Sequence, residues 1–248
     1  MPRVLIPLPN EDFEPTEAAV PWRALRSAGI EVVFATADGK VAKCDPLALE
    51  GVVFGQIGAK PQDAALYREM EADAAYRKPI RYRDVEVESF DALHLTGGHA
   101  PGMRPYLESE ILQAKAVEFF AQQKIVSAIC HGPIVLARAK DPATNLSVLH
   151  GRRVTALTKL LERSAWLLTR WTLGNHFRTY PLYVQDEVIA AIGDASLFDT
   201  GPLIPSYRNP FTLRDGNLLT ARWPGDTHRL ADDLTDLLTP RAQDHAHP

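Results

Sequence analysis

The chain has 248 residues, of which 46% are hydrophobic and 23% are charged, and its formal net charge is −4 at pH 7. This composition is typical of a globular protein that buries a sizeable core without cross-links, and the two cysteines, Cys44 and Cys130, make neither a disulfide framework nor a metal-ligand spacing. The sequence has no basic block for nucleic acid, no apolar run that could span a bilayer and no signal-peptide pattern, so we expect a cytoplasmic protein.

The first predicted elements form a βαβ unit. Residues 3–8 are an apolar run typical of a buried strand, and residues 31–35 are a second one. Between them, residues 16–28 have a helical pattern, with Thr16 as a plausible N-cap and with Pro21 inside, where we expect a kink or a late start. A strand, a helix and a strand within about thirty residues predict a parallel sheet.

The middle of the chain predicts an insertion and then further strands. Residues 62–76 look helical, within an inserted segment at about residues 58–90. Strands are predicted at residues 92–95 and 124–129, and an amphipathic helix at residues 110–122 lies between them. A glycine-rich loop follows the first of these strands, and the letters CHGP follow the second.

The last third is less regular. Residues 154–157 predict a short strand, and residues 160–183 are unusually aromatic and basic, which favours a lid, a dimer surface or core packing by aromatic rings. Residues 210–223 predict a hairpin with a type I′ turn at Asp-Gly, and residues 226–238 predict a closing helix. We expect a single α/β domain over residues 1–240, followed by a disordered tail, 241–248.

Cys130 is the strongest candidate for chemistry. It follows a buried strand and precedes a helix that carries Pro133 in its first turn, so it sits on a sharp turn at the carboxyl end of the sheet. Serine hydrolases place their nucleophile on the same kind of elbow. The adjacent helix N-terminus is expected to lower the pKa of the thiol. The alternative is a buried structural cysteine, which is how we interpret Cys44.

Four further residues are expected near this sulfur. His131 could act as a base and could supply a backbone N–H to an oxyanion hole, although it could also be an ordinary exposed or capping histidine. Gly97, Gly98 and His99 follow another strand at the same edge, where a backbone N–H of Gly98 could be the second oxyanion donor or the loop could simply be a turn.

Glu17 lies in the first turn of the first predicted helix, beyond the first strand. A carboxyl close to a thiolate should have a raised pKa and could carry protons near neutral pH. Acidic residues are also common in first turns because they complement the helix dipole, so the residues alone leave both interpretations open.

Taken together, these motifs resemble the ThiJ/PfpI superfamily, which is related to class I glutamine amidotransferases. The stretch AICHGP resembles the family's nucleophile motif, EAAVP its first-helix motif, LTGGHAPG its glycine loop and RDGNLLTARWPGD its C-terminal segment. The resemblance implies a flavodoxin-like three-layer α/β sandwich with a mostly parallel sheet, an inserted helical segment and a C-terminal hairpin. It also implies that Glu17 is the proton partner of Cys130.

Within the superfamily, the length and the insertion are closest to the branch of heat-shock chaperones and glutathione-independent glyoxalases (glyoxalase III). That branch often has a third acid after a VTGF-type stretch, and VTALTKLLE brings Glu162 to this place. The resemblance implies a cysteine-dependent enzyme for a small reactive carbonyl such as methylglyoxal, without an organic cofactor, in a homodimer.

Two alternatives stay open at this point. One is a thiol amidase or peptidase, and the other is a stress chaperone or redox sensor without turnover, since a reactive thiol oxidises readily. We predict no catalytic metal site, because the eight histidines are scattered and no HxxxH or HExxH pair occurs.

Overall fold

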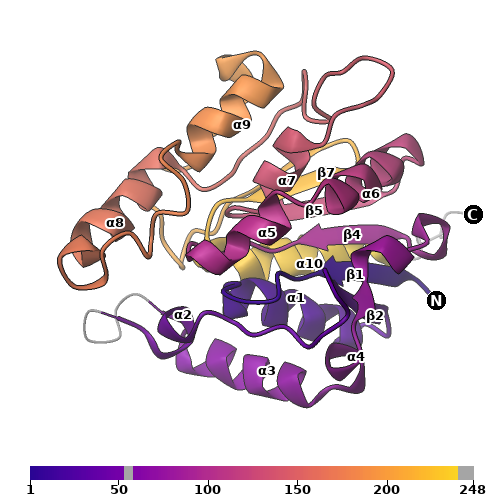
Figure 1. The fold of residues 1–248 in the computed structure, drawn as a ribbon, viewed down its shortest axis with the longest axis horizontal. Helices are drawn as coiled ribbons and strands as arrows, with labels where there is room; N and C mark the ends of the chain where they lie inside the picture. The colour runs from indigo at the N-terminus through magenta and orange to yellow at the C-terminus, as the bar shows by residue number, and fades with distance from the viewer. Residues whose placement is uncertain (53–57, 240–248) are drawn as a thin grey trace, which may run out of the picture.

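The computed structural model describes residues 1–52 and 58–239, and the predicted tail lies outside these residues. A seven-stranded sheet forms the centre of the molecule, with the strand order β3-β2-β1-β4-β5-β7-β6 (Figure 1). Every neighbouring pair is parallel except β6 and β7. The strands are β1 (Arg3–Pro7), β2 (Glu31–Thr36), β3 (Ile80–Arg81), β4 (Ala92–Leu95), β5 (Ile125–Ile129), β6 (Thr212–Asp215) and β7 (Leu218–Ala221).

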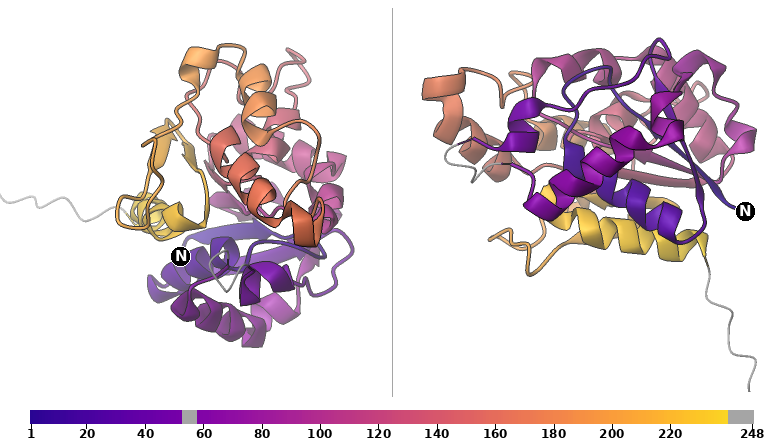
Figure 2. Two further views of the ribbon diagram at one scale, coloured as in Figure 1. Left: turned by 90° about the vertical axis from the view of Figure 1, so that its left-hand side faces the viewer. Right: turned by 90° about the horizontal axis from the view of Figure 1, so that it is seen from below.

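Helices cover both faces of this sheet (Figures 1 and 2). The helices α1, α3 and α10 pack against one another on one face, whereas α5, α6 and α7 lie on the other. Their bounds are α1 (Pro15–Ser27), α2 (Pro46–Glu50), α3 (Pro61–Ala72), α4 (Ala74–Arg77), α5 (Arg104–Leu107), α6 (Glu110–Ala121), α7 (Pro133–Arg138), α8 (Lys159–Leu173), α9 (Val184–Ile192) and α10 (Thr227–Leu238). This arrangement confirms the predicted three-layer α/β sandwich.

The carboxyl ends of β1, β4 and β5 meet at one edge of the sheet, because the three strands are parallel neighbours. Their side chains are almost completely buried, which explains why they read as continuous apolar runs. The helix α8 lies beside this edge (Figure 1). The loops that follow the three strands are therefore brought together, although the strands end at Pro7, Leu95 and Ile129, which are 88 and then 34 residues apart along the chain.

The first helix starts earlier than predicted. Glu14 is its N-cap, and one Glu14 carboxylate oxygen accepts a hydrogen bond from the Glu17 N–H at 2.7 Å. The N-cap expected at Thr16 is wrong, because Pro15 occupies the first helical turn, where its fixed φ and missing N–H are favourable. The helix continues through Pro21.

Two further local predictions are wrong. Residues 154–157 form no strand, and only Val154 makes an isolated bridge, to Phe198. The hairpin exists, but Asp215 pairs with Leu218, so its turn is Gly216–Asn217 instead of Asp-Gly. Only Gly216 of these two has a positive φ, which fits a type II′ turn. The hairpin also extends the main sheet, because β7 pairs with β5.

Candidate active site

Cys130 lies on a strained turn directly after β5. Its φ is +60°, an unusual value for a residue other than glycine. The backbone is held in this shape from two sides, because the Cys130 N–H donates to the Ala221 carbonyl and the Cys130 carbonyl accepts from the Leu157 N–H, at 3.2 and 3.1 Å. Gly132 has no room for a side chain, since an added Cβ would lie 2.4 Å from the Leu95 carbonyl oxygen. The cysteine therefore occupies the elbow that the sequence predicts, and its side chain is fully buried.

The first turn of α1 brings Glu17 to this sulfur. The Glu17 carboxyl lies near the Cys130 side chain, on the other side of Gly97, and its Oε2 accepts a hydrogen bond from the Gly97 N–H at 2.8 Å. Gly97 is closely packed between the two, because an added Cβ would lie 2.7 Å from the Cys130 Cβ and 2.8 Å from the Glu17 Oε2. Within the described chain, the other oxygen, Oε1, is buried without a hydrogen-bond partner.

Pro21 and His94 together fix the backbone of Glu17. In a regular helix the N–H of residue 21 would donate to the carbonyl of residue 17, but proline has no N–H. The Glu17 carbonyl accepts instead from Nε2 of His94, at 2.9 Å, and Nδ1 of His94 lies 3.1 Å from the Ser127 hydroxyl. Because a carbonyl only accepts, His94 carries its proton on Nε2. Burial lowers the pKa of His94 to about 4, so the ring stays neutral.

Thr179 determines which nitrogen of His131 carries a proton. The Thr179 hydroxyl donates to the His99 carbonyl at 2.5 Å and lies 3.2 Å from Nε2 of His131. A hydroxyl has one proton to donate, so toward His131 it must accept, and Nε2 must carry the hydrogen. The lone pair is then on Nδ1, which lies 3.5 Å from the Cys130 sulfur. His131 is therefore oriented as a base for the thiol.

Glu162, expected as the third acid, makes no hydrogen bond to His131 in the part of the chain that the structure describes. One Glu162 oxygen accepts from the Arg178 guanidinium at 2.8 Å, and the other accepts from the Val184 N–H at 3.0 Å. The structure thus uses this buried carboxylate to hold the start of α9 and the segment after α8. In the place of a third acid beside the histidine, the structure has the neutral hydroxyl of Thr179.

The buried thiol and carboxyl perturb each other. Burial raises the pKa of Cys130 well above its usual value, and repulsion from Glu17 and Glu14, where these carboxyls are ionised, raises it further. Burial, and then repulsion by Glu14, likewise raise the pKa of Glu17 well above its usual value. The expected lowering of the thiol pKa by α7 is therefore outweighed, and the pair holds one negative charge more readily than two. Such a pair can pass a proton between oxygen and sulfur.

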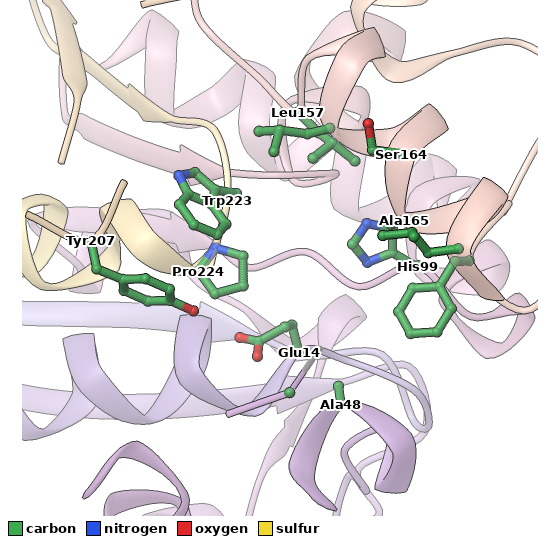
Figure 3. Close-up of a pocket in the computed structure, with 13 residues that line it drawn as sticks. Glu14, Ala48, His99, Leu157, Ser164, Ala165, Tyr207, Trp223 and Pro224 are labelled. Atoms are coloured by element: carbon green, nitrogen blue, oxygen red, sulfur yellow. The ribbon is translucent and has the colours of Figure 1, made fainter. Parts of the chain in front are cut away.

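A cavity of about 250 Å³ adjoins the site through His99, which lines it (Figure 3). Glu14 and His99 point into it from different sides, Trp223 and Tyr207 form another wall, and α8 contributes Ser164 and its neighbours. Burial raises the pKa of Glu14 to about 8, so this carboxyl is largely protonated at neutral pH. Burial lowers the pKa of His99 to about 4. The cavity is therefore mostly apolar, and its uncharged polar groups, Glu14 and His99 among them, can form hydrogen bonds to a ligand.

Two backbone N–H groups, in the loops after β4 and β5, are candidate oxyanion donors. Among the described residues, the N–H of Gly98 has no hydrogen-bond partner. Hydrogen bonding by the His131 N–H favours the charged form of the neighbouring sulfur. The sequence predicts both groups as oxyanion donors, and they come from the loops after β4 and β5.

Comparison with known proteins places the chain in a family. The family model described as "ThiJ/PfpI family-like" matches residues 8–196, which contain Glu17, the glycine loop and the elbow. This chain belongs to that family. The predicted resemblance to the superfamily and to its glyoxalase III branch is confirmed.

Relatives in this family match most of the chain. A deglycase from Pyrococcus abyssi is 33% identical over 240 residues, which cover 95% of this chain and 99% of that protein. A glutathione-independent glyoxalase from Schizosaccharomyces pombe is 25% identical over 90% of this chain and 87% of its own length. The crystal structure of glyoxalase III from Candida albicans has a TM-score of 0.70 at 22% identity and covers 94% of this chain and 95% of its own, which shows the shared fold.

Three residues of the site were not predicted from the sequence. His94 had a signal, because a histidine inside a fully buried strand requires a partner. Glu14 stands in a crowded acidic stretch in which nothing distinguishes it. Thr179 had no signal at all, since only the folded chain brings it to His131, 48 residues away.

No helix among the described residues combines the length and the apolar character that crossing a bilayer requires.

Proposed function

We propose that this protein is a cysteine-dependent enzyme that converts a small reactive carbonyl, such as methylglyoxal, to the hydroxy acid without glutathione. The observation that carries the proposal is the cluster at the elbow, where the Cys130 sulfur lies 3.5 Å from an unprotonated histidine nitrogen and beside the Glu17 carboxyl. Relatives named as glyoxalases and as a deglycase support the same class of substrate.

The reaction begins with addition of sulfur to the aldehyde carbon. Nδ1 of His131 accepts the thiol proton as the S–C bond forms, and the proton passes to the carbonyl oxygen to give a hemithioacetal. The N–H groups of Gly98 and His131 stabilise that oxygen while it is negative. The raised pKa values of Cys130 and Glu17 favour a single negative charge on the pair. Once the sulfur is bonded to carbon, Glu17 is the member of the pair that holds this charge.

Glu17 then performs the isomerisation. Its carboxylate removes the proton from the former aldehyde carbon and returns it to the adjacent carbon, while the hydroxyl proton of the hemithioacetal moves to the oxygen on that adjacent carbon. Together these two proton shifts convert the hemithioacetal into the thioester of lactate. Water hydrolyses the thioester, which releases lactate and restores the thiol. The sum is methylglyoxal plus water to lactate, so no oxidant, reductant or cofactor is consumed. Glu162 has no part in this scheme.

The decisive experiment measures lactate formed from methylglyoxal in the absence of glutathione. We expect turnover by the wild type and by Cys44→Ala, which removes the other thiol, and no turnover above background by Cys130→Ala. Equal lactate formation by wild type and Cys130→Ala would overturn the proposal. An inactive wild type would also contradict it for methylglyoxal.

Larger carbonyl adducts are a second candidate substrate class. The cavity of about 250 Å³ has room for about eight water molecules at about 30 Å³ each, which is more than methylglyoxal needs. A deglycase is among the relatives that match nearly the whole chain. Release of free amine from methylglyoxal-treated N-acetyllysine, compared between wild type and Cys130→Ala, tests this substrate.

A further inference from the structure

Three potential metal ligands meet at the reactive sulfur. The donor atoms of His99, Cys130 and His131 lie within 4.8 Å of one another. His99 comes from the loop after β4 and the other two from the elbow after β5, so their proximity is a product of the fold. A thiolate with two imidazoles is a set that suits Zn²⁺ and similar thiophilic cations.

We propose that these three residues form an inhibitory site for a thiophilic divalent cation of the Zn²⁺ type. This inference concerns occupation of the sulfur by a metal and holds whichever carbonyl the enzyme converts. The cation would bind between the sulfur and the two rings and would mask the nucleophile.

The geometry of the elbow matches tetrahedral coordination. Nδ1 of His131 and the Cys130 sulfur are 3.5 Å apart. With bonds of about 2.3 Å to sulfur and about 2.05 Å to nitrogen, this separation gives an S–Zn–N angle of about 107°, close to the tetrahedral value. These two ligands are therefore already placed, and only the His99 ring has to approach by about 1 Å.

The surroundings supply what such a site needs besides its ligands. Thr179 keeps the proton of His131 on Nε2, which leaves Nδ1 free for the metal, as outer partners of metal-bound histidines commonly do. A Zn²⁺ ion bound to one thiolate keeps a positive charge, and the buried Glu17 oxygen without a hydrogen-bond partner in the described chain can balance it.

The cavity provides an entry path. His99 lines it (Figure 3). The rings of His99 and His131 pack in a T-shaped arrangement with 4.9 Å between their centroids. His99 also packs against Phe177 at 5.4 Å, so a small rotation of one ring between aromatic neighbours brings its nitrogen to the sulfur. A metal in this place leaves a position open for water or for a carbonyl oxygen.

Co²⁺ titration of the reduced, full-length protein tests the site, because a thiolate bound to Co²⁺ has a charge-transfer absorption in the near ultraviolet. We expect one equivalent to produce this band in the wild type and in Cys44→Ala, and no band in Cys130→Ala. The variant His99→Phe keeps the ring packing but removes the nitrogen ligand. Since loss of a mere outer partner costs about 10- to 100-fold in affinity, we expect at least that loss here.

The matched control is His228→Phe, another partly exposed histidine, which pairs with Asp63 away from the sulfur. It should bind Co²⁺ like the wild type. If His99→Phe does not fold, His99→Gln replaces it. Absence of the band in the wild type, its dependence on Cys44, or unchanged affinity in a folded His99 variant would overturn the proposal. Zn²⁺ should also slow alkylation of Cys130 by iodoacetamide, a readout that does not depend on turnover.

Discussion

The interaction between Thr179 and His131 gives the sharpest test of the site. The change Thr179→Val keeps the shape of the side chain and removes its hydroxyl. Nε2 of His131, which is buried, then has no acceptor for its hydrogen. The alternative tautomer places the hydrogen on Nδ1, beside the sulfur, where it can no longer accept the thiol proton. We therefore expect a slower chemical step, while substrate binding is little affected, because Thr179 does not line the cavity.

The size of the effect follows from the cost of an unpaired group. A buried N–H without a partner costs about 1–3 kcal/mol. If about 1–2 kcal/mol of this appears in the barrier, kcat falls by roughly 5- to 30-fold, since about 1.4 kcal/mol corresponds to a tenfold change in rate. The melting temperature should also fall, because the His99 carbonyl loses its donor.

The assay compares kcat and KM for methylglyoxal among wild type, Thr179→Val and Thr179→Ser. The serine variant restores the hydroxyl and should recover most of kcat. A ¹⁵N spectrum of the His131 ring reports the tautomer directly and should change in Thr179→Val only. If Thr179→Val keeps the wild-type kcat and the wild-type ring spectrum, the assignment of the His131 proton is wrong.

Three further predictions concern proton transfer, a buried ion pair and pH. Glu17→Gln keeps an acceptor for the Gly97 N–H but cannot take a proton, so kcat should fall by about 10²- to 10⁴-fold. A fall in kcat of less than about tenfold in a folded variant would contradict the role proposed for Glu17. Arg222→Met leaves the buried Asp226 carboxylate without its ion-pair partner, so urea denaturation should show that the free energy of unfolding falls by about 3–5 kcal/mol. In contrast, Arg229→Met removes an exposed ion pair with Asp233, so the free energy of unfolding should fall by less than about 1 kcal/mol. A hydrogen bond to Asp45 raises the pKa of His176, so its contribution to stability is fully present below about pH 6.5 and is lost as pH rises through the higher folded-state pKa. The difference in melting temperature between wild type and His176→Gln should accordingly shrink from about pH 6 to pH 9, and a constant difference would exclude the ion pair as its cause.

The sequence predicted those features that depend on local pattern. Buried parallel strands read as apolar runs, and Cys130 follows one of them with a helix-starting proline three residues later, so the elbow was recognisable. The position of Glu17 was predicted by its place in a first turn, and its role came from the resemblance. The N-cap was misassigned because Pro15 is the first helical residue, which places the N-cap at Glu14, two residues before Thr16.

Features that depend on distant partners could not be predicted. Glu162 lies in the expected place along the chain, but Arg178 and the start of α9 engage both of its oxygens. The letters DGN allow two different two-residue turns, and only pairing across the strands selects one. Sequence alone also could not tell whether the aromatic stretch is buried. Trp171 is 82% exposed and Leu168 64% exposed, whereas Phe177 is buried against His99.

The left-handed backbone at Cys130 has a consequence for the evolution of the protein. A non-glycine residue in this conformation costs about 1 kcal/mol or more, and here the hydrogen bonds to Ala221 and Leu157 impose it. The same conformation costs glycine nothing. Random variation under selection for stability alone would therefore favour loss of the side chain at position 130. The backbone alone would accept glycine at position 130 at lower cost, so the conformation of this turn does not account for the cysteine side chain.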